Sequence, residues 1–337
     1  MKNCVSFDDV LIQPRYSDIF SRKEISISSQ LSKSVKLNIP IISAPMDTVT
    51  EVDMAVSMHN QGGLGIIYRY NSIEEQVALV RECANSYAVV GAAIGVSGDY
   101  LERAGELIEN GAEVLCVDIA HGHHALMQHA LKTLRNTYGW NVTIIAGNVA
   151  TLEAFNDLSD WGADAIRVGI GGGSICSTRV QTGHGMPTLQ SVIECSRSDR
   201  PAKLIADGGI KNSGDIVKAI GAGADFVMLG SLLSGTPEAP GEVVVDNQGS
   251  KRKVYRGMAS KDAQINWRGH TASIEGVSST VPLKPNVDLV LEELVTNIRS
   301  GLSYSGSKNI REFQAKCTFI GQTSAGAIES STHIMYK

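Results

Sequence analysis

Eight short apolar runs constrain the fold of this chain more strongly than any other feature of its sequence. Each run is rich in aliphatic residues and too short for a typical helix, so it predicts a buried parallel strand. The runs occupy residues 41–44, 64–68, 88–94, 114–119, 143–146, 165–169, 203–206 and 226–229. Helical patterns lie between them, at residues 72–83, 100–110, 124–138, 152–161 and 213–221. Ser72 with Glu75, and the Ser213–Asp215 stretch, predict two of the helix starts.

Strands alternating with helices predict an α/β fold, and eight of them predict a (β/α)₈ TIM barrel that uses residues 1–337 as one domain. The rival is a doubly wound open sheet, but no GxGxxG fingerprint follows the first strand. Two long irregular segments interrupt the rhythm, a loop at 169–187 and a flap-like insertion at 235–285. Both follow carboxyl ends of strands, where barrels carry their active sites.

Composition narrows the class of protein. A hydrophobic content of 43% suffices for a sizeable core, and a net charge of -5 without a basic tract argues against nucleic-acid binding. No apolar run is long enough to span a membrane and no secretory signal opens the chain, so we expect a cytoplasmic protein without membrane contact. No CxxC pair supports a zinc site, and we expect free thiols at Cys4, Cys83, Cys116, Cys176, Cys195 and Cys317.

The segment Gly169–Arg179 is the first candidate for chemistry. Its glycines let the backbone approach a ligand, and Cys176 would lie near amide dipoles and Arg179, conditions that favour a thiolate. We therefore interpret Cys176 as a nucleophile. The alternative is a glycine-rich turn that carries an ordinary cysteine.

Glycine-containing motifs follow strands seven and eight. Asp207-Gly208-Gly209 and Gly230-Ser231 stand where barrels commonly bind phosphate through backbone N–H groups. Asp207 would repel a phosphate but can accept hydrogen bonds from ribose hydroxyls. The motifs predict a nucleotide or flavin-phosphate site; the alternative is two tight turns.

Two further motifs are weaker. Asp118 precedes His121, His123 and His124 after strand four, but without a second carboxylate cluster we interpret Asp118 as an acceptor for a ligand hydroxyl rather than as part of a metal site. In the insertion, Tyr255 could donate to a phosphate, and Glu275 could carry a proton if partly buried. A solvated surface carboxylate is the alternative for Glu275.

In combination, the Ser-Ile-Cys-Ser-Thr loop, Ala-Asp-Gly-Gly-Ile and Tyr-Arg-Gly-Met resemble the IMP dehydrogenase / GMP reductase family, from Phe7 almost to the end. The resemblance implies a barrel usually assembled as a homotetramer, a purine nucleotide substrate, and NAD or NADP as cofactor. It implies that Cys176 attacks carbon 2 of the purine, that Thr178 helps to activate water or handle ammonia, and that Glu275 moves protons.

The resemblance also implies binding roles. The phosphate and ribose positions are Ser174, Asp207, Gly208, Gly209, Gly230, Ser231 and Tyr255, and those near the base are Met46, Gly257, Met258 and Glu275. The nicotinamide side is implied at Asp118, Asn148, Arg167 and Gly169. A K⁺ site is implied at Gly171, Gly173 and Cys176, completed from a neighbouring subunit by Glu329, Ser330 and Ser331 of the tail 318–337.

The positions at which this sequence departs from the family's pattern help to distinguish between the family's two activities. No regulatory CBS modules follow the second strand, but some dehydrogenases also lack them. The flap between Met258 and Glu275 lacks the Arg-Tyr pair with which dehydrogenases activate water, and Thr182-Gly183 is similar to reductases. The segments 43–51 and 255–258 and the tail look like dehydrogenase, and Arg268 is a possible substitute for the missing arginine. We favour GMP reductase, with IMP dehydrogenase as the alternative.

Two other classes remain open. A flavin-dependent barrel would share the phosphate site, and a nucleotide-binding barrel without activity would share the fold. The intact set of Cys176, Thr178 and Glu275 argues against the second.

Overall fold

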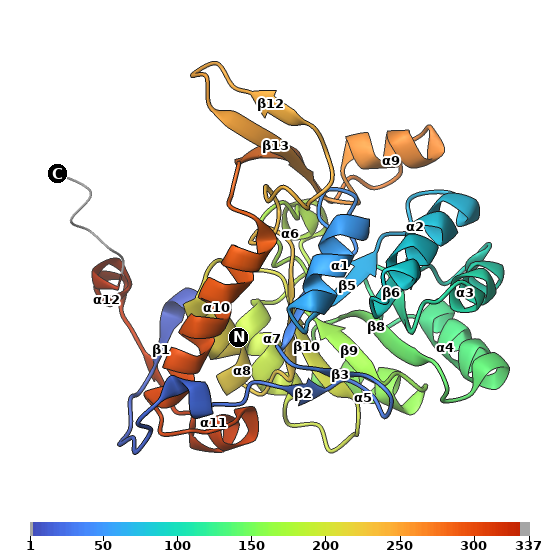
Figure 1. The fold of residues 1–337 in the computed structure, drawn as a ribbon. Helices are drawn as coiled ribbons and strands as arrows, with labels where there is room; N and C mark the ends of the chain where they lie inside the picture. The colour runs from blue at the N-terminus through green and yellow to red at the C-terminus, as the bar shows by residue number, and fades with distance from the viewer. Residues whose placement is uncertain (1–2, 331–337) are drawn as a thin grey trace.

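A closed barrel of eight parallel strands forms the centre of the computed structural model, which describes residues 3–330 (Figure 1). Its strands are β4 (Ile41–Ser43), β5 (Leu64–Ile67), β6 (Val90–Ile94), β7 (Val114–Asp118), β8 (Thr143–Val149), β9 (Ala165–Val168), β10 (Lys203–Asp207) and β11 (Phe226–Leu229). β11 pairs with β4, with Val227 opposite Ile41, so the sheet has no free edge. The predicted barrel is confirmed and the open sheet is wrong.

Helices surround the barrel (Figure 1). They are α1 (Val52–Asn60), α2 (Ile73–Asn85), α3 (Tyr100–Glu109), α4 (Ala125–Tyr138), α5 (Leu152–Asp160), α7 (Thr188–Cys195), α8 (Ser213–Gly221) and α10 (Val287–Ser303). The predicted capping box of α2 is present, with Ser72 accepting from the Glu75 N–H and Glu75 accepting in return. Helix α8 begins at Ser213 as predicted, but its cap is Asn212, whose side chain accepts from the Asp215 N–H.

The strands are buried on both faces, which explains their continuous apolar runs. One set of side chains, including Ile66, Cys116 and Phe226, fills the barrel interior. The N-terminal hairpin of β2 (Ser29–Gln30) and β3 (Lys36–Leu37) adds Leu31 and neighbouring residues to this interior cluster. The hairpin therefore closes the amino-terminal end of the barrel.

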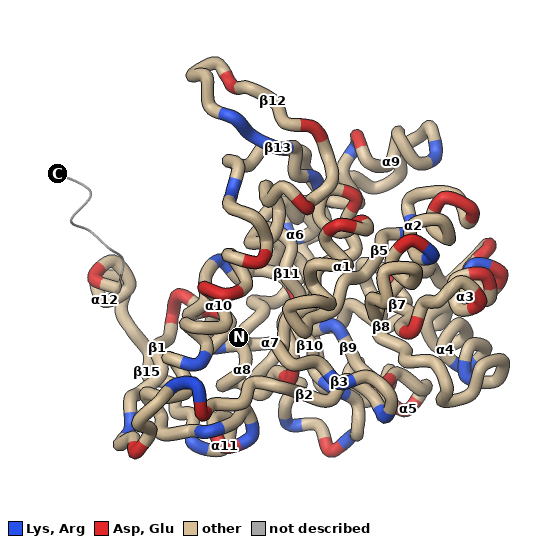
Figure 2. Tube along the Cα trace, viewed as in Figure 1, with Lys and Arg blue, Asp and Glu red and all other residues tan. Residues whose placement is uncertain are grey.

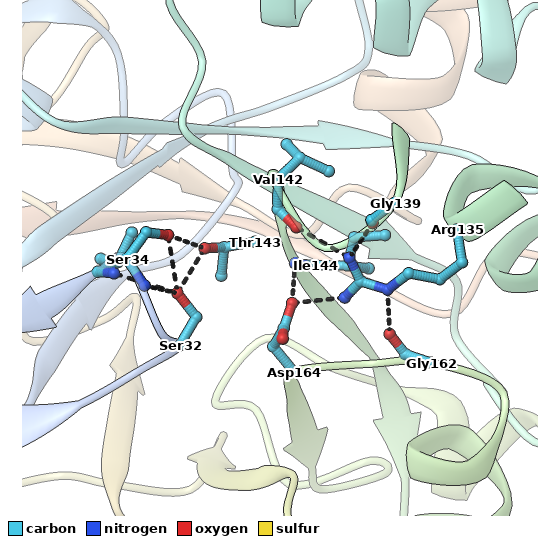
Figure 3. Close-up of polar contacts among 10 residues, drawn as sticks. Ser32, Ser34, Arg135, Gly139, Val142, Thr143, Ile144, Gly162 and Asp164 are labelled. Atoms are coloured by element: carbon cyan, nitrogen blue, oxygen red, sulfur yellow. Dashed lines mark hydrogen bonds and ion pairs between the residues drawn. The ribbon is translucent and has the colours of Figure 1, made fainter. Parts of the chain in front are cut away.

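Polar contacts fix the loops at this amino-terminal end (Figure 3). The Ser32 hydroxyl lies 2.7 Å from that of Thr143, the first residue of β8. Arg135 donates to the Gly162 carbonyl and to the Asp164 carboxylate, which also accepts from the Ile144 N–H at 2.8 Å. These bonds join the ends of helices to the starts of β8 and β9, so the closed end is rigidly held.

The insertion after β11 is more ordered than the sequence predicted. It forms a three-stranded antiparallel sheet of β12 (Val243–Val245), β13 (Lys251–Arg256) and β14 (Ser278–Pro282), together with helix α9 (Lys261–Arg268). Figure 1 shows β12 and β13 projecting beyond the barrel. Only Ala263 and Gln264 of α9 are buried, so the helix has almost no apolar stripe to reveal it in the sequence.

The two ends of the described chain meet on the outside of the barrel. Strand β1 (Val10–Ile12), after the 3₁₀ turn η1 (Phe7–Asp9), pairs antiparallel with β15 (Phe319–Gly321). Between them lie η2 (Arg22–Glu24) near the start of the chain and α11 (Ile310–Lys316) near its end, and α12 (Ser324–Glu329) follows β15. Figure 2 shows acidic and basic residues of both signs scattered over the fold. Within residues 3–330, no helix is long and apolar enough to cross a membrane.

Candidate active site

A cavity of about 290 Å³ opens at the carboxyl ends of the strands. It gathers every residue that the sequence assigned to catalysis, substrate or cofactor, and the three positions assigned to K⁺ on the Cys176 loop. These are Met46, Asp118, Asn148, Arg167, Gly169, Gly171, Gly173, Ser174, Cys176, Thr178, Asp207, Gly208, Gly209, Gly230, Ser231, Tyr255, Gly257, Met258 and Glu275. Residues from six strand ends and the insertion thus share one site.

Cys176 lies on the loop between β9 and the short helix α6 (Thr178–Thr182). Its side chain is exposed, and its thiol donates to the Thr178 hydroxyl at 3.2 Å. The Cys176 N–H donates to the Gly173 carbonyl at 3.1 Å, which closes a tight turn around the sulfur. A thiol and a hydroxyl that accepts its hydrogen bond therefore lie side by side.

The end of the insertion pairs directly with this loop. Cys176 forms an antiparallel bridge with Gly276, the Ser177 N–H donates to the Glu275 carbonyl at 2.8 Å, and the Val277 N–H donates to the Ile175 carbonyl at 3.0 Å. Glu275 is half-buried, and its carboxylate accepts from the Ser273 hydroxyl at 3.0 Å. Partial burial, the condition set for Glu275 as a proton carrier, is met.

Arg179, which the sequence placed near Cys176, makes its hydrogen bonds within the loop. Its guanidinium donates to the carbonyls of Ile170 and Met186, at 3.3 Å for Ile170. A side chain on Gly171, whose φ is +76°, would place its Cβ 2.5 Å from the Arg179 side chain. Arg179 therefore connects the two ends of the Cys176 loop, and its hydrogen bonds go to carbonyls rather than to the thiol.

The motifs after β10 and β11 form one end of the cavity. Gly208 and Gly209 both have left-handed backbone, at φ +88° and +78°. Tyr255 is buried and hydrogen-bonds Ser174. A Cβ at position 230 would lie 2.9 Å from the Tyr255 hydroxyl, so only a glycine at this position leaves that hydroxyl free to approach a ligand. Burial raises the pKa of Tyr255 to about 12, so its hydroxyl stays protonated and can donate.

A charged network adjoins this end of the cavity. Arg167, on β9, lies between the carboxylates of Asp118 and Asp207. Burial alone would lower the pKa of Arg167, but the two carboxylates hold it well above its ordinary value. Oδ2 of Asp207 accepts from Arg167 Nε at 3.0 Å and from Asn148 Nδ2 at 2.8 Å. Arg167 and Asn148 thus orient the carboxylate of Asp207 through Oδ2, and Oδ1 has no hydrogen-bond partner among the described residues.

Sequence reasoning missed Arg69 and Tyr70, two polar side chains that line the cavity. They follow β5 directly, at a strand end, which was the available signal. Arg69 Nε lies 3.7 Å from an Asp118 oxygen and, among the described residues, has no hydrogen-bond partner although it is buried. Tyr70 stacks on Trp267 of α9, with ring centroids 4.0 Å apart.

Two predicted positions, Glu329 and Ser330, are not brought into the site of their own chain. They lie at the end of α12, which stands apart from α6 in Figure 1. The third, Ser331, lies outside the described residues. Within one chain, the described part of the tail therefore does not reach the Cys176 loop.

Two of the three histidines after β7 have structural partners. His123 hydrogen-bonds Asp157 at 2.8 Å, and His124 caps α4 by accepting from the Leu126 N–H. Across residues 3–330, no group of three or more His, Cys, Asp and Glu side chains is arranged to hold a metal ion.

Arg268, considered as a substitute for the missing flap arginine, is not among the residues that line the cavity. It donates to the Gln264 side chain and, at 3.3 Å, to the His270 carbonyl, and it lies over the Trp267 ring. Its guanidinium is therefore engaged within the flap.

Comparison with known proteins gives a consistent result. A sequence profile described as the IMP dehydrogenase / GMP reductase domain matches residues 4–333. The chain is 34% identical to inosine-5'-monophosphate dehydrogenase of Nitrosopumilus maritimus, over 98% of each chain, and 33% identical to GMP reductase of Leishmania major, over 99% of this chain and 97% of the other. The crystal structure of a GMP reductase variant from Trypanosoma brucei in complex with guanosine 5'-monophosphate superposes with a TM-score of 0.95, at 34% identity, over 99% of this chain and 98% of the other.

Proposed function

Because this chain belongs to the IMP dehydrogenase / GMP reductase family, we propose that it is a purine nucleotide oxidoreductase that reduces GMP to IMP and ammonia. The choice of GMP reduction over IMP oxidation rests on one observation. Arg268, the only arginine between Met258 and Glu275, is engaged within the flap and does not line the cavity. Without an arginine from the flap to activate water, hydrolysis of a Cys176 adduct would be slow, because removing a general base commonly costs about 10²–10⁴ in rate.

Binding would use the two ends of the cavity. The phosphate of the nucleotide would accept from the Tyr255 hydroxyl, from Ser174 and Ser231, and from the backbone at Gly209 and Gly230. The free Oδ1 of Asp207 would accept from the ribose hydroxyls. The base would then lie toward Met46, Gly257 and Met258, next to Cys176.

The covalent step would begin at Cys176. Its thiol adds to carbon 2 of guanine as the electron pair of the C2–N3 double bond moves to N3, and the thiol proton is relayed through the Thr178 hydroxyl toward Glu275. A proton returns from those groups to the exocyclic amine, the bond from carbon 2 to that nitrogen breaks, the C2–N3 double bond re-forms, and ammonia leaves. The purine remains attached to Cys176 until carbon 2 receives a hydride, when the thiolate departs and IMP is released.

The remaining part of the cavity fits a nicotinamide cofactor, NAD or NADP in type. Asp118 can accept from a ribose hydroxyl, and the buried Arg69 Nε, which lacks a hydrogen-bond partner among the described residues, can donate to an anionic or carbonyl oxygen. Asn148, Arg167 and Gly169 shape the wall between cofactor and nucleotide. When bound, the reduced cofactor would supply the hydride that replaces the amine, so GMP, one hydride and one proton balance to IMP and ammonia.

The direct test is an assay of the purified protein in both directions. With GMP and NADPH or NADH, we expect oxidation of the cofactor, followed by its absorbance, with release of ammonia and IMP in equal amounts. Conversion of IMP and NAD to XMP without GMP reduction would overturn the proposed direction, and a yellow protein that requires flavin would overturn the proposed class.

One observation favours IMP dehydrogenase as a second candidate. Arg69 and Tyr70 form an Arg-Tyr pair that lines the cavity, although from the β5 loop and not from the flap. If this pair activates water, Arg69→Ala would abolish XMP formation while leaving formation of the Cys176 adduct intact.

We further propose that the protein assembles as a homotetramer in which a K⁺ site at Gly171, Gly173 and Cys176 is completed by a neighbour's tail. The support is indirect. The end of α12 is exposed and stands away from its own catalytic loop, so another copy would have to bring Glu329 and Ser330 to that loop.

A further inference from the structure

We propose that Gln264, on helix α9 of the insertion, is a positioning residue that sets Glu275 against the catalytic loop. The proposal rests on the proposed function only in giving Glu275 a role in turnover. Gln264 itself contacts neither Cys176 nor the cavity; its action is entirely through the backbone around Glu275.

Gln264 is buried, at 2% exposed, and both ends of its amide are used. Nε2 donates to the carbonyls of Ala259 and Ser273, each at 3.0 Å. Oε1 accepts from the Ala272 N–H at 2.8 Å and from Arg268. One side chain therefore joins the segment that enters α9 to the segment that leaves it.

The segments that Gln264 joins are those that hold Glu275. The Ala259 carbonyl, which accepts from Gln264, also accepts from the Glu275 N–H at 3.1 Å. The Ser273 hydroxyl donates to the Glu275 carboxylate at 3.0 Å. Gln264 thus fixes both the backbone and the side-chain partner of Glu275, one residue before the bridge to Cys176.

Helix α9 is in turn anchored to the barrel rim, so Gln264 has a fixed base. Trp267 stacks on Tyr70, with an interplanar angle of 14°, and Arg69 lies with its guanidinium 5.8 Å from the Trp267 ring centroid. A continuous series of contacts therefore links the barrel rim, through α9 and Gln264, to Glu275 and the Cys176 loop.

Gln264→Met tests the proposal, because methionine has a similar length and volume but cannot replace the amide bonds. We expect kcat to fall by roughly tenfold or more, by the factor that 1.4 kcal/mol represents. The KM for GMP should change less than about twofold, because the phosphate end of the cavity is untouched. The limb of the pH–kcat profile that depends on Glu275 should also shift. Gln248→Met, on the exposed turn between β12 and β13, is the matched control and should leave all three quantities unchanged.

Hydrogen exchange supplies a readout that does not depend on which reaction the enzyme catalyses. In Gln264→Met, peptides that contain the amides of Ser177 and Val277 should exchange roughly tenfold faster or more, while peptides from the barrel strands keep their wild-type rates. A wild-type protein without GMP reductase activity would refute the proposed function but leave this measurement valid. Unchanged exchange at these two amides, or a KM that rises in proportion to the fall in kcat, would refute the role of Gln264.

Ser273→Ala keeps the test decisive if Gln264→Met fails to fold. It removes only the hydroxyl that donates to Glu275, at an exposed position, so the fold should persist. We expect the pH–kcat profile of Ser273→Ala to shift as in Gln264→Met, with little change in hydrogen exchange. An unaltered profile would contradict the path from Gln264 through Ser273 to Glu275.

Discussion

Cys176 is held by partners that lie about a hundred residues away in the sequence, through its bridge to Gly276. The nearer partner, the Thr178 hydroxyl at 3.2 Å, accepts the hydrogen bond of the thiol. The placement of Cys176, on which the proposed role as nucleophile depends, is therefore set by the insertion as much as by its own loop.

Cys176→Ala should abolish turnover, since loss of a nucleophile commonly costs a factor of roughly 10⁴ or more. Affinity for GMP, measured by calorimetry, should stay within a few fold of wild type because the phosphate and ribose contacts remain. Cys4→Ala, at another exposed cysteine, should be fully active. Residual turnover above about one per cent of wild type would exclude the covalent route.

Tyr255→Phe should raise the KM for GMP about tenfold, because a hydrogen bond to a charged group contributes about 1.5–3 kcal/mol. Since burial raises the pKa of Tyr255 to about 12, the wild-type KM should not rise through pH 10, where an exposed tyrosine ionises. The contribution of Tyr255 to folding stability, full below about pH 10, is lost between about pH 10 and 12. A KM that climbs with a midpoint near pH 10 would show that Tyr255 is not shielded in this way.

At the scale of elements, the strand ends carry most of the site, and the sequence revealed them for a physical reason. Strands buried on both faces read as continuous apolar runs, so the polar or glycine residue after each run stands out, as at Asp118, Asp207 and Gly230. Arg69 and Tyr70 also follow such a run, but no glycine or carboxylate accompanies them to mark a ligand site. The sequence pattern did not predict helix α9, because polar contacts of Gln264 rather than an apolar stripe hold the helix in place.

The β2–β3 hairpin should contribute to folding stability and not to activity. Leu31→Ala should therefore lower stability without changing the kinetic constants. Leu31 is 1% exposed within the barrel interior, so its truncation should lower the free energy of unfolding by about 2–5 kcal/mol. The KM and kcat should be unchanged at room temperature, because the cavity is at the other end of the barrel. Leu289→Ala, at an exposed position of α10, is the control for chemical denaturation. A large change in KM with little loss of stability would contradict this division.

At the scale of the whole molecule, the tail is the element that stands apart from the site of its own chain. Removing residues 324–337 leaves β15 paired with β1 but deletes α12 and the residues after it. If a neighbour's tail completes the cation site, wild-type activity should rise when K⁺ replaces Li⁺ at constant ionic strength, and the truncated protein should lose that response. Light scattering would report whether the assembly survives. Equal wild-type activity in both salts would remove the support for the site.

The closure of the barrel by β4 and β11 has a consequence for how the protein is made. Ile41 emerges from the ribosome early, but its partner Val227 follows only after roughly 10–40 s at about 5–20 residues per second. During that interval one edge of β4 lacks its hydrogen-bonding partner, and the partner of β1, strand β15, is synthesised later still. Nascent chains stalled before residue 226 should therefore recruit holdase chaperones, whereas chains released complete can close the ring and bury that edge.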